Sequence, residues 1–347
     1  MNKEQIIKDF EERIDLYHNL EEIAVMLVEA EMMRKHFFLM DIAHRVKTRS
    51  AVEGKLEKYR DRFKSITDIT DLVGLRIICY FQDDVDRIAE CLTELFNVVE
   101  IRDKRVKANI SEFGYLSLHY ICTLKDVEQY PESLRSIRFE IQIRTVLQHA
   151  WAQIEHDLGY KSHFGVSSPI RRKFSRMAGL LEIADEQFMD LRDSSKEYTE
   201  EIQKAIREDR GDQIVIDNVS LKEYMENSRF IEDFFNAFSE KINIAIFMDD
   251  IGIYLDQLVW LEVNTLGEFR ELILRNQTEA EQMVCEKCEQ EKYDFASATL
   301  FMQSVFKAEL SRRRCTRAQL IRFFSLGKFD RKKAVQRAEE VLNRNGK

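Results

Sequence analysis

The strict alternation of apolar and polar residues over residues 138–145, RFEIQIRT, is the feature that most constrains the fold. Successive side chains of a β-strand point to opposite faces, so this pattern predicts a strand with one buried face. The opposite face carries Glu140, Gln142 and Arg144. Such a polar row is either the solvated side of an antiparallel sheet or the floor of a site, and alternation alone leaves both interpretations open.

Further strands and helices follow from the same reading of the chain. Strands are expected at 73–81, 97–103, 114–124 and 137–145, and helices at 3–35, 49–63, 83–96 and 145–160. The order strand, helix, strand, loop, strand, strand, helix is typical of an α+β domain, in which helices flank a mixed β-sheet.

The length of 347 residues is enough for two domains, each with its own core. A long helix is expected after Pro169, which suits a first helical turn, and the helical pattern breaks at 207–218. We therefore predict one domain at 1–212 and a second, mostly helical domain at 213–347.

The composition excludes several classes of protein. The net charge of −9 gives no general attraction to nucleic acid and argues against a DNA-binding protein. No apolar run approaches the roughly 20 residues of a membrane span, and the charged, amphipathic N-terminus is unlike a secretory signal. Six scattered cysteines are typical of reduced thiols. These features predict a cytoplasmic protein without membrane contact.

Candidate chemistry concentrates on the polar strand faces. Tyr115, Ser117 and His119 share one face of their predicted strand, and Asp71 lies just before another strand. Two carboxylates from separate segments, Asp71 and Glu140, occur among many cationic residues. That combination suits a hard metal ion and polyphosphate oxygens. The glycine-rich phosphate loop of P-loop ATPases does not occur in the sequence, which excludes that class.

Five separate motifs change this interpretation. They stand in the order and spacing of the RelA/SpoT synthetase domain, and their sequences are RVKTRSAVEGKL, ITDLVGLRI, GYLSLHY, FEIQIRT and WAQIEHDLGYKS. The chain resembles that family over residues 40–165. It lacks the His-Asp motif of the companion hydrolase domain, so it resembles a synthetase-only, stand-alone small alarmone synthetase.

The resemblance implies an activity and a fold. Members of the family transfer the β,γ-pyrophosphate of ATP to the 3′-hydroxyl of GDP or GTP, which releases AMP and makes the stringent-response alarmone (p)ppGpp. Their fold resembles that of nucleotidyltransferases. By resemblance, Arg45 and Arg76 would hold the adenine of ATP between their planar guanidinium groups. Lys47, Ser50 and Lys55 would bind the ATP phosphates.

The resemblance also assigns the catalytic groups. Asp71 would coordinate Mg²⁺, and Glu140 would lie beside the metal and act as general base on the 3′-hydroxyl. Tyr115 would stack on the acceptor base, and His119 would contact the acceptor phosphate or ribose. The other expected acceptor-side residues are Gln142, Arg144, His149, Lys104 and Lys107.

The acceptor loop departs from the family pattern. Many members carry Lys-Pro-Asn-Gly-Tyr-Arg-Ser where this chain has SEFGYLS at 111–117, so two cationic groups are replaced. Lys104, Arg105 and Lys107 are candidates to compensate. The change leaves an alternative open: a toxin-like pyrophosphokinase that acts on tRNA 3′ ends or adenine nucleotides and is restrained by its C-terminal domain. A non-catalytic nucleotide-sensing module is the second alternative, although retention of both carboxylates counts against it.

The C-terminal third matches no family by its motifs. Cys285 and Cys288 form a lone CxxC, which leaves metal binding and two ordinary thiols as alternatives. Aromatic residues at helical spacing in 230–238 and 298–306 predict a core. The basic segment 311–337 could contact RNA, an acidic partner or the N-terminal domain. A tRNA or protein partner and self-association into a homo-oligomer are therefore further expectations.

Overall fold

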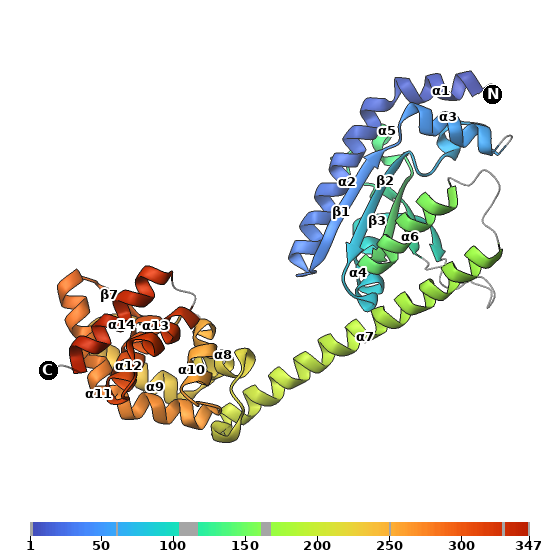
Figure 1. Cartoon of the computed structure of the whole chain (residues 1–347). Helices are drawn as coiled ribbons and strands as arrows, with labels where there is room; N and C mark the ends of the chain where they lie inside the picture. The colour runs from blue at the N-terminus through green and yellow to red at the C-terminus, as the bar shows by residue number, and fades with distance from the viewer. Residues whose placement is uncertain are drawn as a thin grey trace. The chain divides into compact units, whose positions relative to one another are not determined.

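The computed structural model describes residues 3–59, 62–103, 117–160, 168–249, 251–327 and 330–345. The chain forms two compact units, Met1–Arg192 and Asp193–Lys347, called here the N-terminal unit and the C-terminal unit. Figure 1 shows that the division falls within the long helix α7 (Ser168–Arg207). The domain boundary expected after residue 212 lies downstream of this division and stays a prediction.

The N-terminal unit is built on a five-stranded sheet with the strand order β1-β2-β5-β4-β3. β2 and β5 are parallel and the other neighbours are antiparallel, so the predicted mixed sheet is confirmed. The strands are β1 (Leu39–Val46), β2 (Val73–Cys79), β3 (Phe96–Asp103), β4 (Leu118–Leu124) and β5 (Phe139–Thr145).

Strand β1 was not predicted from the sequence. It lies at the edge of the sheet and pairs only with β2, where Arg45 stands opposite Gly74. None of its eight residues is fully buried. An edge strand with so little burial needs no continuous apolar face. The segment LMDIAHRV therefore lacks the alternation of apolar and polar residues by which a strand is predicted.

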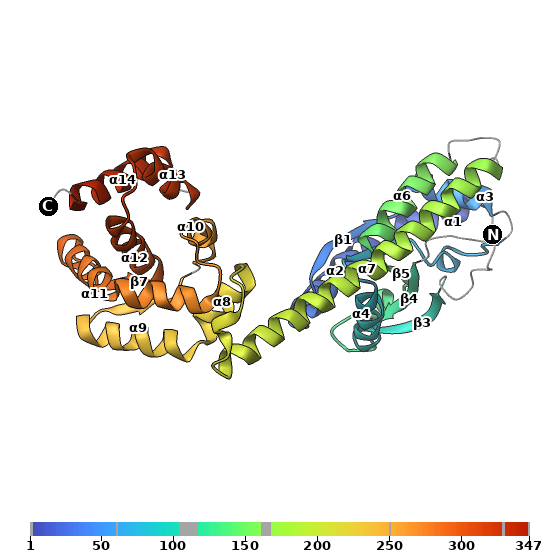
Figure 2. The same cartoon turned by 60° about the horizontal axis from the view of Figure 1, so that its bottom comes forward.

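Helices flank this sheet, and α2 and α4 pack their apolar side chains against one face of it (Figures 1 and 2). The helix expected over 3–35 is divided at Arg13 into two helices. Thr48 caps the N-terminus of α3 by accepting a hydrogen bond from the amide of Ala51. The helices are α1 (Lys3–Glu12), α2 (Ile14–Arg34), α3 (Arg49–Lys58), α4 (Gln82–Leu95), α5 (Glu132–Arg135) and α6 (Val146–Tyr160), with a short 3₁₀ turn at Ile66–Asp68.

The C-terminal unit is mostly helical, as predicted, and has a separate apolar core that begins at Ile202. Its helices are α8 (Asn218–Asn227), α9 (Arg229–Ile242), α10 (Leu255–Trp260), α11 (Leu266–Glu291), α12 (Ala298–Arg312), α13 (Arg317–Leu326) and α14 (Arg331–Asn345). Strands β6 (Ala245–Phe247) and β7 (Phe295–Ser297) form a small parallel sheet, and 3₁₀ turns lie at Gly211–Gln213 and Gly252–Tyr254. The two aromatic stripes are core, because Phe238 and Phe301 are buried against each other.

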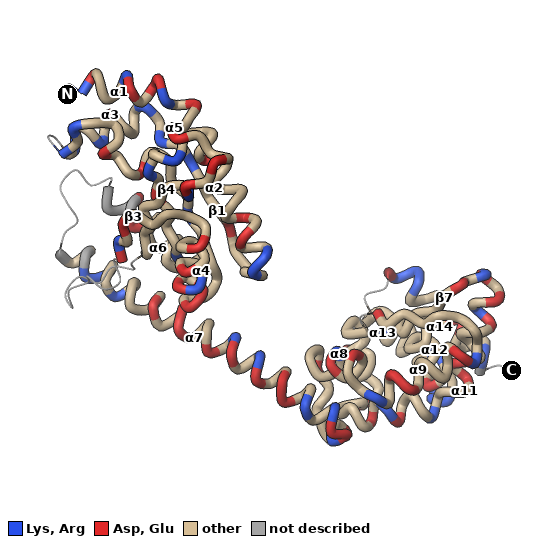
Figure 3. Tube along the Cα trace, turned by 180° about the vertical axis from the view of Figure 1, so that it is seen from behind, with Lys and Arg blue, Asp and Glu red and all other residues tan. Residues whose placement is uncertain are grey.

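Several charged residues of the basic segment 311–337 pair with carboxylates of the C-terminal unit itself. The ion pairs are Arg312–Glu279, Arg313–Glu309 and Arg317–Glu339. Acidic and basic residues also interleave along α7 (Figure 3). Cys285 and Cys288 lie on α11, and no group of three metal-ligating side chains occurs among the described residues. None of the helices in the described ranges combines the length and apolar character that crossing a bilayer requires.

Candidate active site

The face of the sheet opposite α2 and α4 carries the polar rows seen in the sequence. β4 and β5 are antiparallel neighbours with His119 opposite Gln142, as expected if their polar faces were to combine. In the parallel pair, Gly74 stands opposite Glu140, and Arg76 stands opposite Gln142. Three neighbouring strands, β2, β5 and β4, therefore contribute adjacent polar side chains to one surface.

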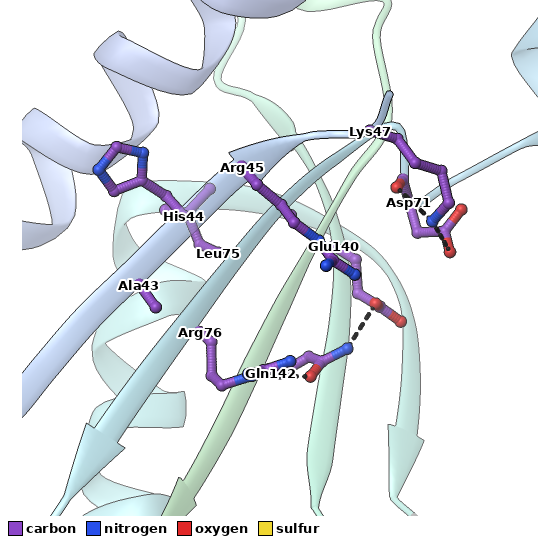
Figure 4. A pocket seen from close by; sticks show the side chains of 10 residues that line it. Ala43, His44, Arg45, Lys47, Asp71, Leu75, Arg76, Glu140 and Gln142 are labelled. Carbon is purple, nitrogen blue, oxygen red and sulfur yellow. Dashed lines mark hydrogen bonds and ion pairs between the residues drawn. The ribbon is translucent and has the colours of Figure 1, made fainter. Parts of the chain in front are cut away.

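A pocket of about 140 Å³ opens on this surface (Figure 4). Its volume is below the several hundred Å³ typical of whole small-molecule sites, so it would hold only part of a ligand of that size. Figure 4 shows His44 turned away from the other side chains, and its Nδ1 lies 2.9 Å from Oε1 of Glu21 on α2. The pocket is lined by Ala43, His44, Arg45, Lys47, Asp71, Gly74, Leu75, Arg76, Glu140 and Gln142.

Asp71 is held between two lysine side chains at the rim of the pocket. Nζ of Lys55 donates to Oδ1 at 2.6 Å, and Nζ of Lys47 donates to Oδ2 at 2.9 Å. Burial by itself would raise the pKa of Asp71, but the hydrogen bonds and charges of the two lysines outweigh burial and lower it. Asp71 is therefore ionised at neutral pH.

Glu140 is the second carboxylate of the pocket, and both of its oxygens have partners. Nδ1 of His119 lies 3.0 Å from Oε1, and Nε2 of Gln142 donates to Oε2 at 2.8 Å. Burial would raise the pKa of Glu140, but the hydrogen bond and charge of His119, together with Gln142, lower it, while Asp71 opposes them. The side chain is 12% exposed, so a nearly buried carboxylate stays ionised and faces the pocket.

His119 lies behind Glu140, with only 6% of its surface exposed. Its Nε2 is 2.6 Å from the hydroxyl of Ser117, so both ring nitrogens have partners within the protein. The expected contact between His119 and an acceptor remains a prediction, and no unpartnered ring nitrogen is available for it in this arrangement.

Arg76 and Arg144 add positive charge to the same face of the sheet, and His149 lies close to them at the start of α6. Burial and the charge of the nearby Arg76 together lower the pKa of Arg144 to about 10, and the charge of Glu140 opposes them. Burial and the charge of Arg45 lower the pKa of Arg76. Burial, with the charges of Arg76 and Arg144, lowers the pKa of His149 and favours its neutral form. Positive charge gathered at partly buried positions is suited to an anionic ligand.

Of the remaining predicted site residues, the structure describes only Ser50. Ser50 is exposed in the first turn of α3, and its hydroxyl is 3.2 Å from that of Thr48. The expected acceptor residues Tyr115, Lys104 and Lys107 fall outside the described residues, as does Arg105.

The donor set fits a divalent cation with few protein ligands. Mg²⁺ usually binds proteins through one or two carboxylates and takes its other ligands from water and substrate phosphates. Asp71 and Glu140 line one pocket, and each carboxylate oxygen keeps a lone pair beyond the hydrogen bond it accepts. The absence of a three-ligand cluster from the described residues is compatible with such a site.

Two residues of this surface received no predicted role. Gly74 lines the pocket between Arg45 and Glu140, and a glycine inside a strand pattern is a recognised sign of close approach by a ligand or backbone. Ser117 shares the face of His119 two residues away, so alternation places it in the site. Asp68, which neighbours Asp71 in sequence, instead accepts hydrogen bonds from the amides of Lys64 and Ser65.

Comparison with known proteins identifies the family. Residues 44–164 match the model described as "Region found in RelA / SpoT proteins". GTP pyrophosphokinase YjbM of Bacillus subtilis (strain 168) is 30% identical over 158 residues, which cover 45% of this chain and 73% of that protein. The chain belongs to the RelA/SpoT family. GTP pyrophosphokinase YwaC of the same strain is 29% identical over 128 residues, which cover 36% of this chain and 58% of that protein.

Solved structures of small alarmone synthetases are also similar to part of the chain. Small alarmone synthetase 1 from Bacillus subtilis is 26% identical with a TM-score of 0.46, and the match covers 55% of this chain and 98% of that one. The same protein bound to its product pppGpp gives a TM-score of 0.45 at 26% identity, with 55% and 99% coverage. Because these scores are below 0.5, the family assignment depends on the sequence matches. All the predicted site residues lie within the RelA/SpoT region, residues 44–164.

Proposed function

We propose that this chain is a GTP pyrophosphokinase, which transfers the β,γ-pyrophosphate of ATP to the 3′-hydroxyl of GDP or GTP and yields (p)ppGpp and AMP. Membership of the RelA/SpoT family supports the reaction type, and both curated relatives bear the name GTP pyrophosphokinase. The observation that carries the proposal is that Asp71 and Glu140, from separate segments, line one pocket together with Arg45, Lys47 and Arg76.

The donor nucleotide is assigned to the side of the pocket formed by β1 and β2. Arg45 and Arg76 come from these adjacent strands, and planar guanidinium groups stack well on a purine. Lys47 and Lys55 are assigned to the ATP phosphates, and both amines already converge on the Asp71 carboxylate. Ser50 extends this set at the start of α3, where amide groups favour anions.

Mg²⁺ is assigned to Asp71 and Glu140. When bound, the ion neutralises charge on the phosphoryl groups that are transferred. Both carboxylates would be ligands of the ion. Glu140 would in addition receive a proton, as described next.

Glu140 is assigned as general base. It accepts the proton of the acceptor 3′-hydroxyl, and the oxygen forms a bond to the β-phosphorus of ATP. The bond between the β-phosphorus and the oxygen bridging to the α-phosphorus breaks, so AMP leaves with the electron pair. The lowered pKa keeps Glu140 in the ionised form that this step needs.

The test is a transfer assay on the purified full-length chain. ATP labelled in the γ-phosphate is supplied with Mg²⁺ and, separately, GDP, GTP, ADP, ATP or bulk tRNA, beside the Glu140→Gln variant. We expect label on GDP or GTP, and a loss of about 100-fold or more in the variant. Label only on tRNA or adenine nucleotides would identify the toxin-like alternative. Absence of transfer to every acceptor, by the full chain and by a chain ending near residue 212, would contradict the proposal and leave a nucleotide-sensing module.

We further propose that residues 213–347 form an accessory, regulatory domain, which in the toxin-like alternative would restrain the activity. Support comes from the separate core of the C-terminal unit and from its position outside the RelA/SpoT region. A chain ending near residue 212 should transfer pyrophosphate faster, or inhibit growth of a host cell more strongly, than the full chain. Equal rates and equal growth would exclude restraint.

A further inference from the structure

Arg144 is buried within the polar face, with 6% of its surface exposed, and does not line the pocket. Its Nη2 atom donates to Oε1 of Gln142 at 2.6 Å and to the hydroxyl oxygen of Ser117 at 3.4 Å. A guanidinium group only donates hydrogen bonds, and Nη2 carries two hydrogens. One nitrogen atom therefore starts two chains of hydrogen bonds.

The first chain passes through Ser117 and His119. Because the Ser117 oxygen accepts from Arg144, its own hydrogen can be donated to Nε2 of His119, which is 2.6 Å away. Neutral histidine carries a hydrogen on its other nitrogen in that case, and Nδ1 then donates to Oε1 of Glu140 at 3.0 Å. The carboxylate end fixes the direction of these bonds, because ionised Glu140 can only accept, so Nδ1 of His119 donates and Nε2 of the neutral ring accepts from Ser117.

The second chain passes through Gln142. Its Oε1 accepts from Arg144, so its amide nitrogen faces Glu140 and donates to Oε2 at 2.8 Å. The two chains thus end on the two oxygens of one carboxylate. They close a ring of five side chains, and the members of the ring are Arg144, Ser117, His119, Glu140 and Gln142.

We propose that Arg144 and Ser117 are positioning residues that orient the Glu140 carboxylate through this ring, a role that rests on the function proposed above. The terminal torsion of a glutamate is broad, and without partners its oxygens rotate freely. The ring holds both oxygens, so the lone pair that receives the proton keeps one direction. Efficient proton transfer needs the base held within about 0.5 Å of its productive position.

The burial of Ser117 and His119 argues against a direct role for the ring in substrate binding. Ser117 is 9% exposed and His119 is 6% exposed, so the members of the ring behind Glu140 are largely withheld from a ligand. Nε of Arg144 is buried and has no hydrogen-bond partner among the described residues. A buried cation with an unsatisfied donor destabilises the folded state. A role in orienting the Glu140 carboxylate accounts for the presence of Arg144 at this position.

The experiment compares Arg144→Met and Ser117→Ala with wild type in the full-length chain, by measuring kcat and the KM values for ATP and GDP. A base displaced by about 1 Å costs about 100-fold in rate, so we expect kcat of Arg144→Met to fall by about that factor with both KM values within about 2-fold. Ser117→Ala breaks one chain only, and we expect a fall of about 10-fold. Ser117→Thr keeps the hydroxyl and should restore most of the rate.

The decisive measurement repeats Arg144→Met in the Glu140→Gln background. If Arg144 acts through Glu140, the double variant should be no slower than Glu140→Gln alone. Arg192→Met is the matched control, because it removes another paired arginine of the N-terminal unit that has no bond to the ring. It should leave kcat unchanged.

Three results would overturn the inference. A raised KM for GDP with unchanged kcat would make Arg144 an acceptor-binding residue. A further fall in the Glu140→Gln background would show a general structural role. If Arg144→Met does not fold, as judged by circular dichroism, equal rates for Ser117→Ala and Ser117→Thr would refute the ring. A wild-type sequence inactive with every acceptor, both at full length and ending near residue 212, would refute the proposed function itself, which is distinguishable because wild type is active in the other cases.

Discussion

Replacing Gly74 with a larger residue should raise the stability of the N-terminal unit and lower its activity. Gly74 lies in β2 between Arg45 and Glu140 and lines the pocket. The nearest heavy atom to a Cβ built at this position is the carbonyl oxygen of Glu140, at 4.0 Å, which is an ordinary contact. Alanine is therefore accommodated without strain, but its methyl group occupies the floor of the pocket.

The expected effect on stability follows from the unfolded chain. Removing a glycine at a compatible position raises the free energy of unfolding by about 0.4–1 kcal/mol, because the unfolded state loses conformational freedom. In a unit of this size, that corresponds to an increase in Tm of about 1–4 °C. Valine adds two more carbons and suits a strand, so it should keep at least wild-type stability.

The expected effect on activity is opposite in sign. A side chain between Arg45 and Glu140 displaces the nucleotide, and a displacement of about 1 Å costs about 100-fold in rate. Thermal unfolding and the transfer assay, run on Gly74→Ala and Gly74→Val, measure the two quantities. Gly54→Ala is the matched control, because Gly54 is exposed on α3 with open space around its Cβ position, so it should gain stability and keep its activity. A Gly74→Val variant with wild-type kcat/KM for ATP would refute the assignment of this pocket to the donor.

Three other perturbations have defined outcomes. Asp71→Asn should reduce transfer by about 100-fold or more and leave its two lysine partners without a carboxylate; normal activity at saturating Mg²⁺ would contradict the metal assignment. The hydrogen bond from Arg192 lowers the pKa of Asp83, so the stability from this pair is present above the unfolded pKa and lost as pH falls through the folded pKa. Arg192→Met should therefore cost about 0.5–1 kcal/mol in urea unfolding at pH 7 and less in acid, where Asp83 is protonated and only the contact of the guanidinium with the Phe81 ring remains; an equal cost at both pH values would disprove the ion-pair origin. Phe139→Ala removes a buried ring packed 5.2 Å from that of Phe96 and should cost about 3–5 kcal/mol by urea unfolding; a cost below 1 kcal/mol would show that the site is poorly packed.

The central strands were predictable because their pattern is local. β2 and β5 are buried on the core side, so apolar residues recur at every second position and the polar residues between them stand out. The family motifs then implied roles for those polar residues, including Asp71 and Glu140. β1 escaped prediction because an edge strand with little burial has no such pattern.

The amino-acid sequence by itself determined which side chains share a face within each strand, because the alternation of a strand depends only on neighbouring residues. Only the tertiary structure decided which faces meet, because strand order and register depend on contacts between residues far apart in the chain. It placed two lysines on Asp71 and made Ser117 and Arg144 partners across 27 positions of sequence. The environment of Glu140 was decided there too, since its lowered pKa depends on a histidine from the neighbouring strand.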